Sequence, residues 1–80
     1  MALPRTDAQV LAARCAQYLA GGAGLETVVR EAGEAADKTQ NSELAAKLRY
    51  IADPPSEPLA ATAIVELKAA LDEAVQSGRL

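Results

Sequence analysis

Residues 57–76, EPLAATAIVELKAALDEAVQ, predict one long amphipathic helix, and this helix decides the fold. On a helical wheel with about 3.6 residues per turn, its apolar residues collect in one continuous arc that is expected to face the core. The arc consists of Leu59, Ala60, Ala63, Ile64, Leu67, Ala70, Leu71, Ala74 and Val75. Because an arc this wide can receive several helices, we expect the rest of the chain to pack around residues 57–76.

The segment before this helix, PPSEP at residues 54–58, is interpreted as a joint between two helices. Ser56 is a common type of N-cap, Glu57 suits the positive end of the helix dipole, and Pro58 is tolerated in a first turn. A linker between domains is disfavoured because the preceding part is too short to hold a separate core. The PxxP spacing also fits a polyproline ligand, but no basic residue stands beside it. Gly78 is expected to end the helix.

The opposite side of this helix carries a second row of small side chains. Ala61, Val65 and Ala69 share one face, and Asp72 lies beside them. Small side chains would let another backbone come close, so we predict that these four residues bind a partner, which a second copy of the chain would also satisfy. The alternative is that they are ordinary helix-forming residues exposed to solvent.

The first of three helices expected upstream covers residues 7–20. A capping box, in which Thr6 and Gln9 bond each other's backbone amides, is expected to begin it. The sequence GGAG at residues 21–24 is expected to end it, because glycine accepts the left-handed backbone of a C-cap. Its predicted apolar face consists of Leu11, Cys15, Tyr18 and Leu19.

The other two helices are expected at residues 25–38 and 42–52, separated by TQNS at residues 39–42. These polar side chains compete for backbone hydrogen bonds, so Asn41 or Ser42 is expected to cap the later helix. A single helix over residues 25–52 is the alternative, but the apolar stripe loses its phase near Thr39. Gly33 suggests a close contact with a neighbouring helix.

Length and composition indicate one small domain over residues 1–80. Half of the residues are apolar, alanine is abundant, and the chain has no Phe or Trp. Few residues favour strands, so we predict an all-α fold, a compact bundle of three or four helices. A core of this size supplies only about 3–5 kcal/mol of net stability, and self-association would add to it.

Charge and terminal sequence indicate a cytoplasmic protein. The formal net charge is −3, and the single cysteine cannot form an internal disulfide. The start, MALPRTDAQV, lacks the basic and apolar regions of a signal peptide. No apolar run approaches the roughly 18 residues that a membrane span requires, so no membrane partner is expected.

The residue inventory excludes most catalytic and metal chemistry. The chain has no histidine and one cysteine, which removes His-based nucleophile activation, His-based metal sites and cysteine-rich clusters. Cys15 shares a face with Leu11, so we interpret it as a buried, inert thiol. Glu31 and Glu34 share a helix face and are interpreted as solvated acids. We assign no catalytic, cofactor-binding or metal-binding residue and expect no enzyme activity.

Two binding roles rank below protein binding. Lys38, Lys47 and Arg49 cluster around the helix at 42–52 and would serve a small DNA-binding regulator, although the chain lacks a clearly basic face. Ser42, in QNSELAAKL, would be the attachment site of a carrier protein. Acyl carrier proteins have an Asp-Ser-Leu motif; here Asn precedes and Glu follows the serine, so the chain is not assigned to that family.

The leading hypothesis is a non-enzymatic protein that acts by binding another protein, as an adaptor, regulator or inhibitor. It depends on the exclusions above and on the second face of the helix at 57–76. A specific version is a phage-type acidic inhibitor of a nucleic-acid-handling or host-defence complex, whose negative helices compete for a basic groove. No motif identifies the partner.

Overall fold

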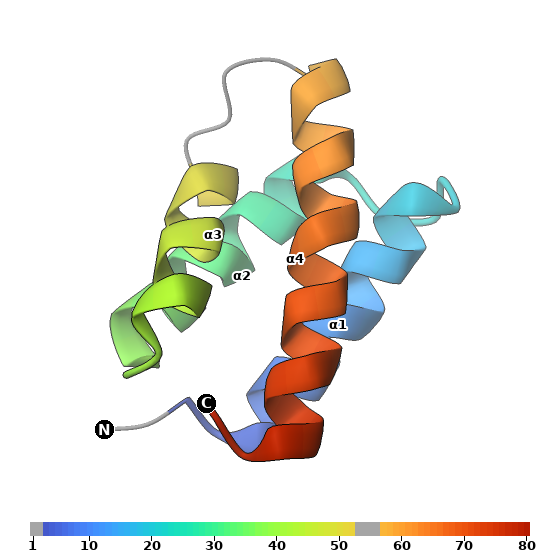
Figure 1. Ribbon diagram of the computed structural model, residues 1–80. Helices are drawn as coiled ribbons and strands as arrows, with labels where there is room; N and C mark the ends of the chain where they lie inside the picture. Colours follow the sequence, from blue (N-terminus) through green and yellow to red (C-terminus); the bar gives the residue numbers. More distant parts are fainter. Residues whose placement is uncertain (1–2, 53–56) are drawn as a thin grey trace.

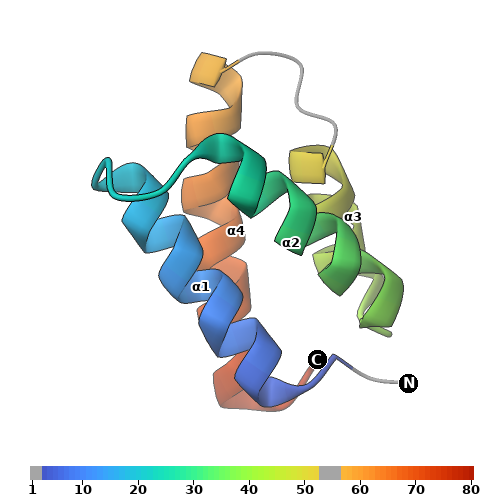
Figure 2. The same ribbon diagram turned by 180° about the vertical axis from the view of Figure 1, so that it is seen from behind.

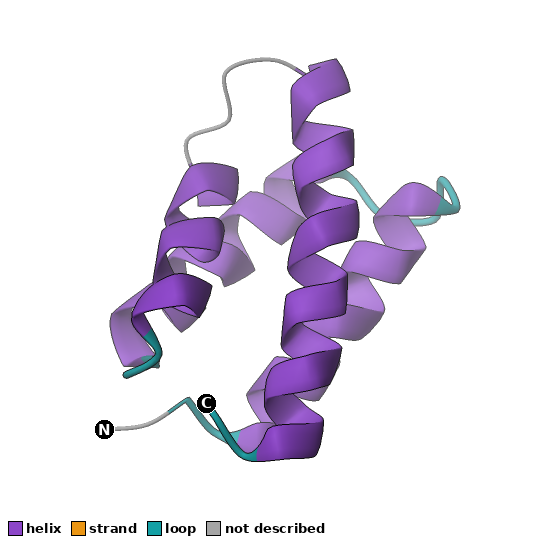
Figure 3. Ribbon diagram, viewed as in Figure 1, coloured by secondary structure: helices purple, strands orange, loops and turns teal. Residues whose placement is uncertain are grey.

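The computed structural model describes the backbone of residues 3–52 and 57–80, and the side chains of residues 3–52 and 61–80. Four helices account for most of these residues, and the described part contains no strand (Figure 3). They are α1 (Arg5–Leu19), α2 (Leu25–Lys38), α3 (Ser42–Ala52) and α4 (Glu57–Ser77). The predicted all-α bundle is therefore confirmed, and three of the four predicted spans agree with the structure to within one residue.

The helices form a closed ring in which each one packs against two others. Contacts join α1 to α2, α2 to α3, α3 to α4, and α4 back to α1. Figures 1 and 2 show α4 beside α1, with the two helices running in opposite directions. The bundle measures 30 × 21 × 17 Å along its principal axes. The longest helix, α4, thus packs against α1 and α3. On the side away from α4, α2 packs against the same two helices.

The core is built from one apolar stripe of each helix. Its largest fully buried side chains are Leu11, Cys15, Val28, Leu48, Ile51, Ile64, Leu67 and Leu71. Alanines account for eight of the eighteen buried apolar residues in the described part. Because alanine fills little space, close-packed interiors of this composition require closely approaching helices.

The predicted apolar arc of α4 is buried where its side chains are described. Ala63, Ile64, Leu67, Leu71 and Ala74 belong to the core, and Ala70 and Val75 pack against it. Leu59 and Ala60 lie outside the residues whose side chains are described.

The ends of α4 agree with the sequence where they are described. The helix begins at Glu57, which places Pro58 in the first turn as expected. It ends with Gly78 at φ 73°, and the backbone N–H of Arg79 donates to the Ala74 carbonyl at 3.0 Å. The predicted Ser56 cap and the joint at residues 54–56 lie outside the described residues.

The start of α1 differs from the prediction. The N-cap is Pro4, in an extended conformation without a side-chain cap, and Thr6 lies exposed inside the first turn. The Thr6–Gln9 capping box is therefore wrong. The reason is tertiary: the Leu3 side chain is 2% exposed in the core, and its N–H donates to the Leu80 backbone oxygen at 3.3 Å. The chain leaves the core at Pro4 and enters the helix at once.

The end of α1 confirms the role of the glycines. Gly21 has φ 84°, and the N–H groups of Gly22 and Gly21 donate to the carbonyls of Gln17 and Tyr18 at 2.7 and 3.0 Å. These are the two bonds of a Schellman cap. Leu19 is a correction to the predicted apolar face: it is the last residue of the helix and its side chain is 42% exposed.

The polar break between α2 and α3 is confirmed, and the alternative of one helix over residues 25–52 is wrong. Asn41 is the cap: its Oδ1 accepts the backbone N–H groups of Glu43 and Leu44, each at 3.1 Å. Its Nδ2 also donates to the Arg79 carbonyl at 2.8 Å, and Thr39 Oγ1 donates to the Leu80 backbone oxygen at 2.7 Å. The loop therefore caps α3 and also holds the last two residues of the chain by hydrogen bonds.

Gly33 lies where α2 approaches α3, as the sequence suggested. A methyl group added at its Cα would be 3.8 Å from the Cβ of Ala52, which is an ordinary van der Waals distance. We therefore expect Gly33→Ala to raise the free energy of unfolding by roughly 0.5–1 kcal/mol, because alanine loses less backbone entropy in a helix. Urea unfolding followed by circular dichroism measures this difference.

Gly21→Ala is the matched control for that substitution. Gly21 has free space around its Cα but a positive φ of 84°. An alanine there would meet no neighbouring atom but would be held in a backbone conformation that L-residues disfavour. Gly21→Ala should destabilise the protein, and destabilisation by Gly33→Ala as well would contradict the spacing between α2 and α3.

Candidate functional site

The outer side of α4 carries the four residues predicted to bind a partner. Val65 is 54% exposed and Ala69 and Asp72 are exposed, whereas Ala61 is half-buried. Leu67, two residues after Val65, is 0% exposed. The predicted division of the helix into a core side and an outer side is therefore confirmed, while partner binding at these residues stays a prediction.

A groove between α4 and α1 extends this surface. It has a volume of about 390 Å³ and is lined by Gln9, Ala12, Ala13 and Ala16 of α1 and by Lys68, Asp72, Val75 and Gln76 of α4. Asp72 thus lies in the groove, whereas Val65 and Ala69 are exposed on the outer side of α4 and do not belong to its lining. The sequence analysis did not predict the α1 wall of this groove. The available signal was the lack of charge at Ala13 and Gln17, which the structure places at exposed positions of α1.

This combined surface is nearly free of net charge. From Val10 to Leu25 the chain contains one charged residue, Arg14, and α4 has none between Leu59 and Val65. In the groove itself, Lys68 Nζ lies 3.0 Å from Asp72 Oδ2 and the two charges offset each other. We call this surface the α1/α4 face and define it by Gln9, Ala13, Ala16, Ala61, Val65 and Ala69, with the Lys68–Asp72 pair.

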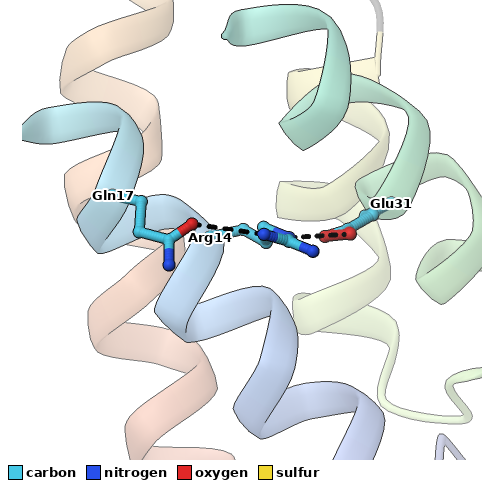
Figure 4. Close-up of polar contacts among 3 residues, drawn as sticks. All are labelled: Arg14, Gln17 and Glu31. Atoms are coloured by element: carbon cyan, nitrogen blue, oxygen red, sulfur yellow. Dashed lines mark hydrogen bonds and ion pairs between the residues drawn. The ribbon is translucent and has the colours of Figure 1, made fainter. Parts of the chain in front are cut away.

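The one charged residue of central α1 points to the other neighbour of that helix. Arg14 Nε donates to Glu31 Oε1 of α2 at 3.2 Å, and Arg14 Nη1 donates to Gln17 Oε1 at 3.3 Å (Figure 4). This pairing turns the guanidinium away from α4, so Arg14 adds no charge to the α1/α4 face. The cause is α2, whose packing on α1 supplies the carboxylate.

Glu31 corrects the expectation that both acids of α2 are solvated. Its side chain is 22% exposed and its Oε2 is buried without a hydrogen-bond partner among the described residues, whereas Glu34 is exposed as predicted. Both acids line a cavity of about 240 Å³ between α1 and α2, which Lys38 Nζ and Asp7 Oδ2 flank at 3.2 Å from each other. No group of three or more metal-binding side chains occurs in the described part of the chain.

Cys15 lies in the core with 0% exposure, as predicted. Burial raises the pKa of its thiol from 9.0 to about 11, so the nucleophilic thiolate is scarce at neutral pH.

We expect no reaction of the folded protein with Ellman's reagent at mildly alkaline pH and prompt reaction in guanidinium. Rapid modification of the folded protein would contradict this burial. Because the folded pKa is the higher one, stability should also decline as pH rises from 9 toward 11.

The residues of the lower-ranked roles lie on α3 and at the end of α2. Lys47 and Arg49 are exposed, but Lys38 is paired with Asp7 of α1, which leaves a weaker basic cluster than the sequence suggested. Ser42 is the exposed first residue of α3. DNA binding and a carrier role stay predictions. No helix in the described part is both long and apolar enough to cross a membrane.

No protein-family model, curated protein or solved structure matches the chain. The class of site is therefore defined by its own geometry: a groove without net charge between two antiparallel helices, with alanines on its α1 wall and the Lys68–Asp72 pair on its α4 wall.

Proposed function

We propose that the protein acts by binding another protein through the α1/α4 face, as a non-enzymatic cytoplasmic adaptor, regulator or inhibitor. The observation that supports this proposal is the surface across α1 and α4, which has no net charge and carries several small side chains, with Val65 54% exposed on its α4 side. The cores of protein interfaces are depleted of charged residues, and small side chains allow close approach of a second backbone. The fitting partner is a helix that presents apolar side chains to the groove.

A pull-down with site variants tests this proposal. Wild-type protein, Val65→Asp and Tyr50→Asp are used as baits, with nuclease present and at rising salt. Tyr50 is a matched control because it is 46% exposed on α3, away from the α1/α4 face. A partner retained by wild type and Tyr50→Asp but lost with Val65→Asp supports the proposal.

Two outcomes of this experiment would count against the proposal. A partner that binds Val65→Asp as well as wild type places the binding surface elsewhere. A partner that is released by moderate salt fits the acidic-inhibitor hypothesis instead, because charge attraction between exposed groups is screened by salt.

A further inference from the structure

We infer that Asn41 is a deamidation site whose rate of reaction is controlled by the hydrogen bonds that join the α2–α3 loop to residues 79 and 80. We call two of these bonds the latch: Asn41 Nδ2 donates to the Arg79 carbonyl at 2.8 Å, and Thr39 Oγ1 donates to the Leu80 backbone oxygen at 2.7 Å. The inference is independent of the proposed function, because the latch does not involve the α1/α4 face.

The chemistry is intrinsic to the sequence. Asn41 is the only asparagine of the chain, and the small residue Ser42 follows it. Asparagine is a labile residue because the next backbone nitrogen can attack its side chain. Here the Ser42 nitrogen bonds to Asn41 Cγ, a five-membered succinimide ring closes, and Nδ2 leaves as ammonia with the proton that the Ser42 nitrogen gives up. Water then opens the ring at either carbonyl, which leaves aspartate or isoaspartate in place of Asn41.

The folded structure holds the Asn41 carboxamide by three hydrogen bonds. Oδ1 accepts the N–H groups of Glu43 and Leu44, each at 3.1 Å, and Nδ2 donates to the Arg79 carbonyl. Thr39 adds a backbone restraint, because its Oγ1 accepts the Asn41 N–H at 3.1 Å. Ring closure changes the geometry at Cγ and expels Nδ2, so it requires these bonds to open. Deamidation of the folded protein should therefore proceed through local opening of the latch, and the population of the open form sets the rate.

Deamidation makes the opening permanent. Both products lack the Nδ2 donor, and a carboxylate oxygen then faces the Arg79 carbonyl, so the latch is weakened. Aspartate keeps an acceptor for the first turn of α3, and its charge suits the N-terminus of a helix. Leu3 also loses support, because its N–H donates to the Leu80 backbone oxygen at 3.3 Å.

Mass spectrometry of the protein during incubation at mildly alkaline pH tests the inference, with peptide mapping to confirm that the change is at Asn41. Wild type should deamidate much more slowly when folded than in urea. Thr39→Val keeps the shape of the side chain but removes its hydroxyl, so it should accelerate the reaction of the folded protein roughly fivefold. Gly21→Ala is the matched control, because it destabilises the protein at the other end of α1 and leaves the latch intact. Its rate should equal that of wild type.

Several results would overturn the inference. A folded protein that deamidates as fast as the protein in urea would show that the bonds to Asn41 give no protection. Equal acceleration by Gly21→Ala and Thr39→Val would show that global unfolding, and not the latch, controls the reaction. The absence of any acceleration by Thr39→Val would remove the latch from the mechanism.

Asn41→Asp reproduces one product and tests the expected consequence. Hydrogen exchange at the Leu3 amide should become roughly fivefold faster or more, because the latch is weakened. The amides of Glu43 and Leu44 should stay protected, because the carboxylate still caps α3. Unchanged exchange at Leu3 would overturn the link between deamidation and release of residues 79 and 80.

Discussion

Leu67→Asp should unfold the protein, whereas Val65→Asp, two residues earlier on the same helix, should leave the monomer folded. Leu67 is 0% exposed in the middle of α4, and Val65 is 54% exposed on the opposite side. Replacing a buried leucine loses about 2–5 kcal/mol of packing before the cost of an unpaired buried carboxylate is counted. The packing loss and the carboxylate cost together exceed the roughly 3–5 kcal/mol expected for a domain of this size.

Far-UV circular dichroism and thermal unfolding of both variants measure this result. Leu67→Asp should show no cooperative transition near neutral pH, and Val65→Asp should keep the helical spectrum and a cooperative transition. The reverse pattern would show that the two sides of α4 are wrongly assigned, and the α1/α4 face would have to be abandoned with them.

Asn41→Ala should cost about 2 kcal/mol, which is a large share of the stability of so small a domain. The variant removes the cap of α3, formed by Oδ1 with the N–H groups of Glu43 and Leu44, and the Nδ2 bond to the Arg79 carbonyl. Loss of the second bond should also loosen the last residues of the chain, leaving Thr39 as their remaining side-chain tie to the loop.

Urea unfolding measures the total cost, and hydrogen exchange at the Glu43 and Leu44 amides measures the loss of the cap itself. Ser42→Ala is the matched control, because Ser42 is the neighbouring residue, is exposed, and is not the cap. It should change stability by only a few tenths of a kcal/mol. A larger effect of Ser42→Ala than of Asn41→Ala would contradict the assignment of the cap.

The helices could be predicted from the sequence because their signals are local. The apolar spacing of residues 57–76 identified the buried side of α4, and glycines at positive φ, Gly21 and Gly78, identified two helix ends. The one helix start that failed, at Thr6, failed because Leu3 is buried and commits the chain to a helix two residues earlier. No spacing within the first ten residues reveals what covers Leu3.

Only the α4 part of the candidate site could be predicted from the sequence. The outer row of α4, with Val65 and Ala69, follows from helical periodicity alone. The α1 wall of the groove depends on which helix becomes the neighbour of α4, and the sequence pattern of α1 did not specify that choice. The pairing of Arg14 with Glu31 could not be predicted, because the two residues belong to different helices, and Glu31 alone is typical of a solvated acid.

The sequence by itself determined an all-α bundle of three or four helices, their approximate ends, and the side of α4 that is buried, because each depends on residues within a few turns of one another. The tertiary structure decided the ring order of the helices, the groove between α1 and α4, and the fastening of the chain's last residues. The contacts concerned join residues far apart in the sequence, as in Arg14–Glu31, Asn41–Arg79 and Thr39–Leu80. Such pairs form only when all four apolar stripes share one core, and no local pattern encodes that shared packing.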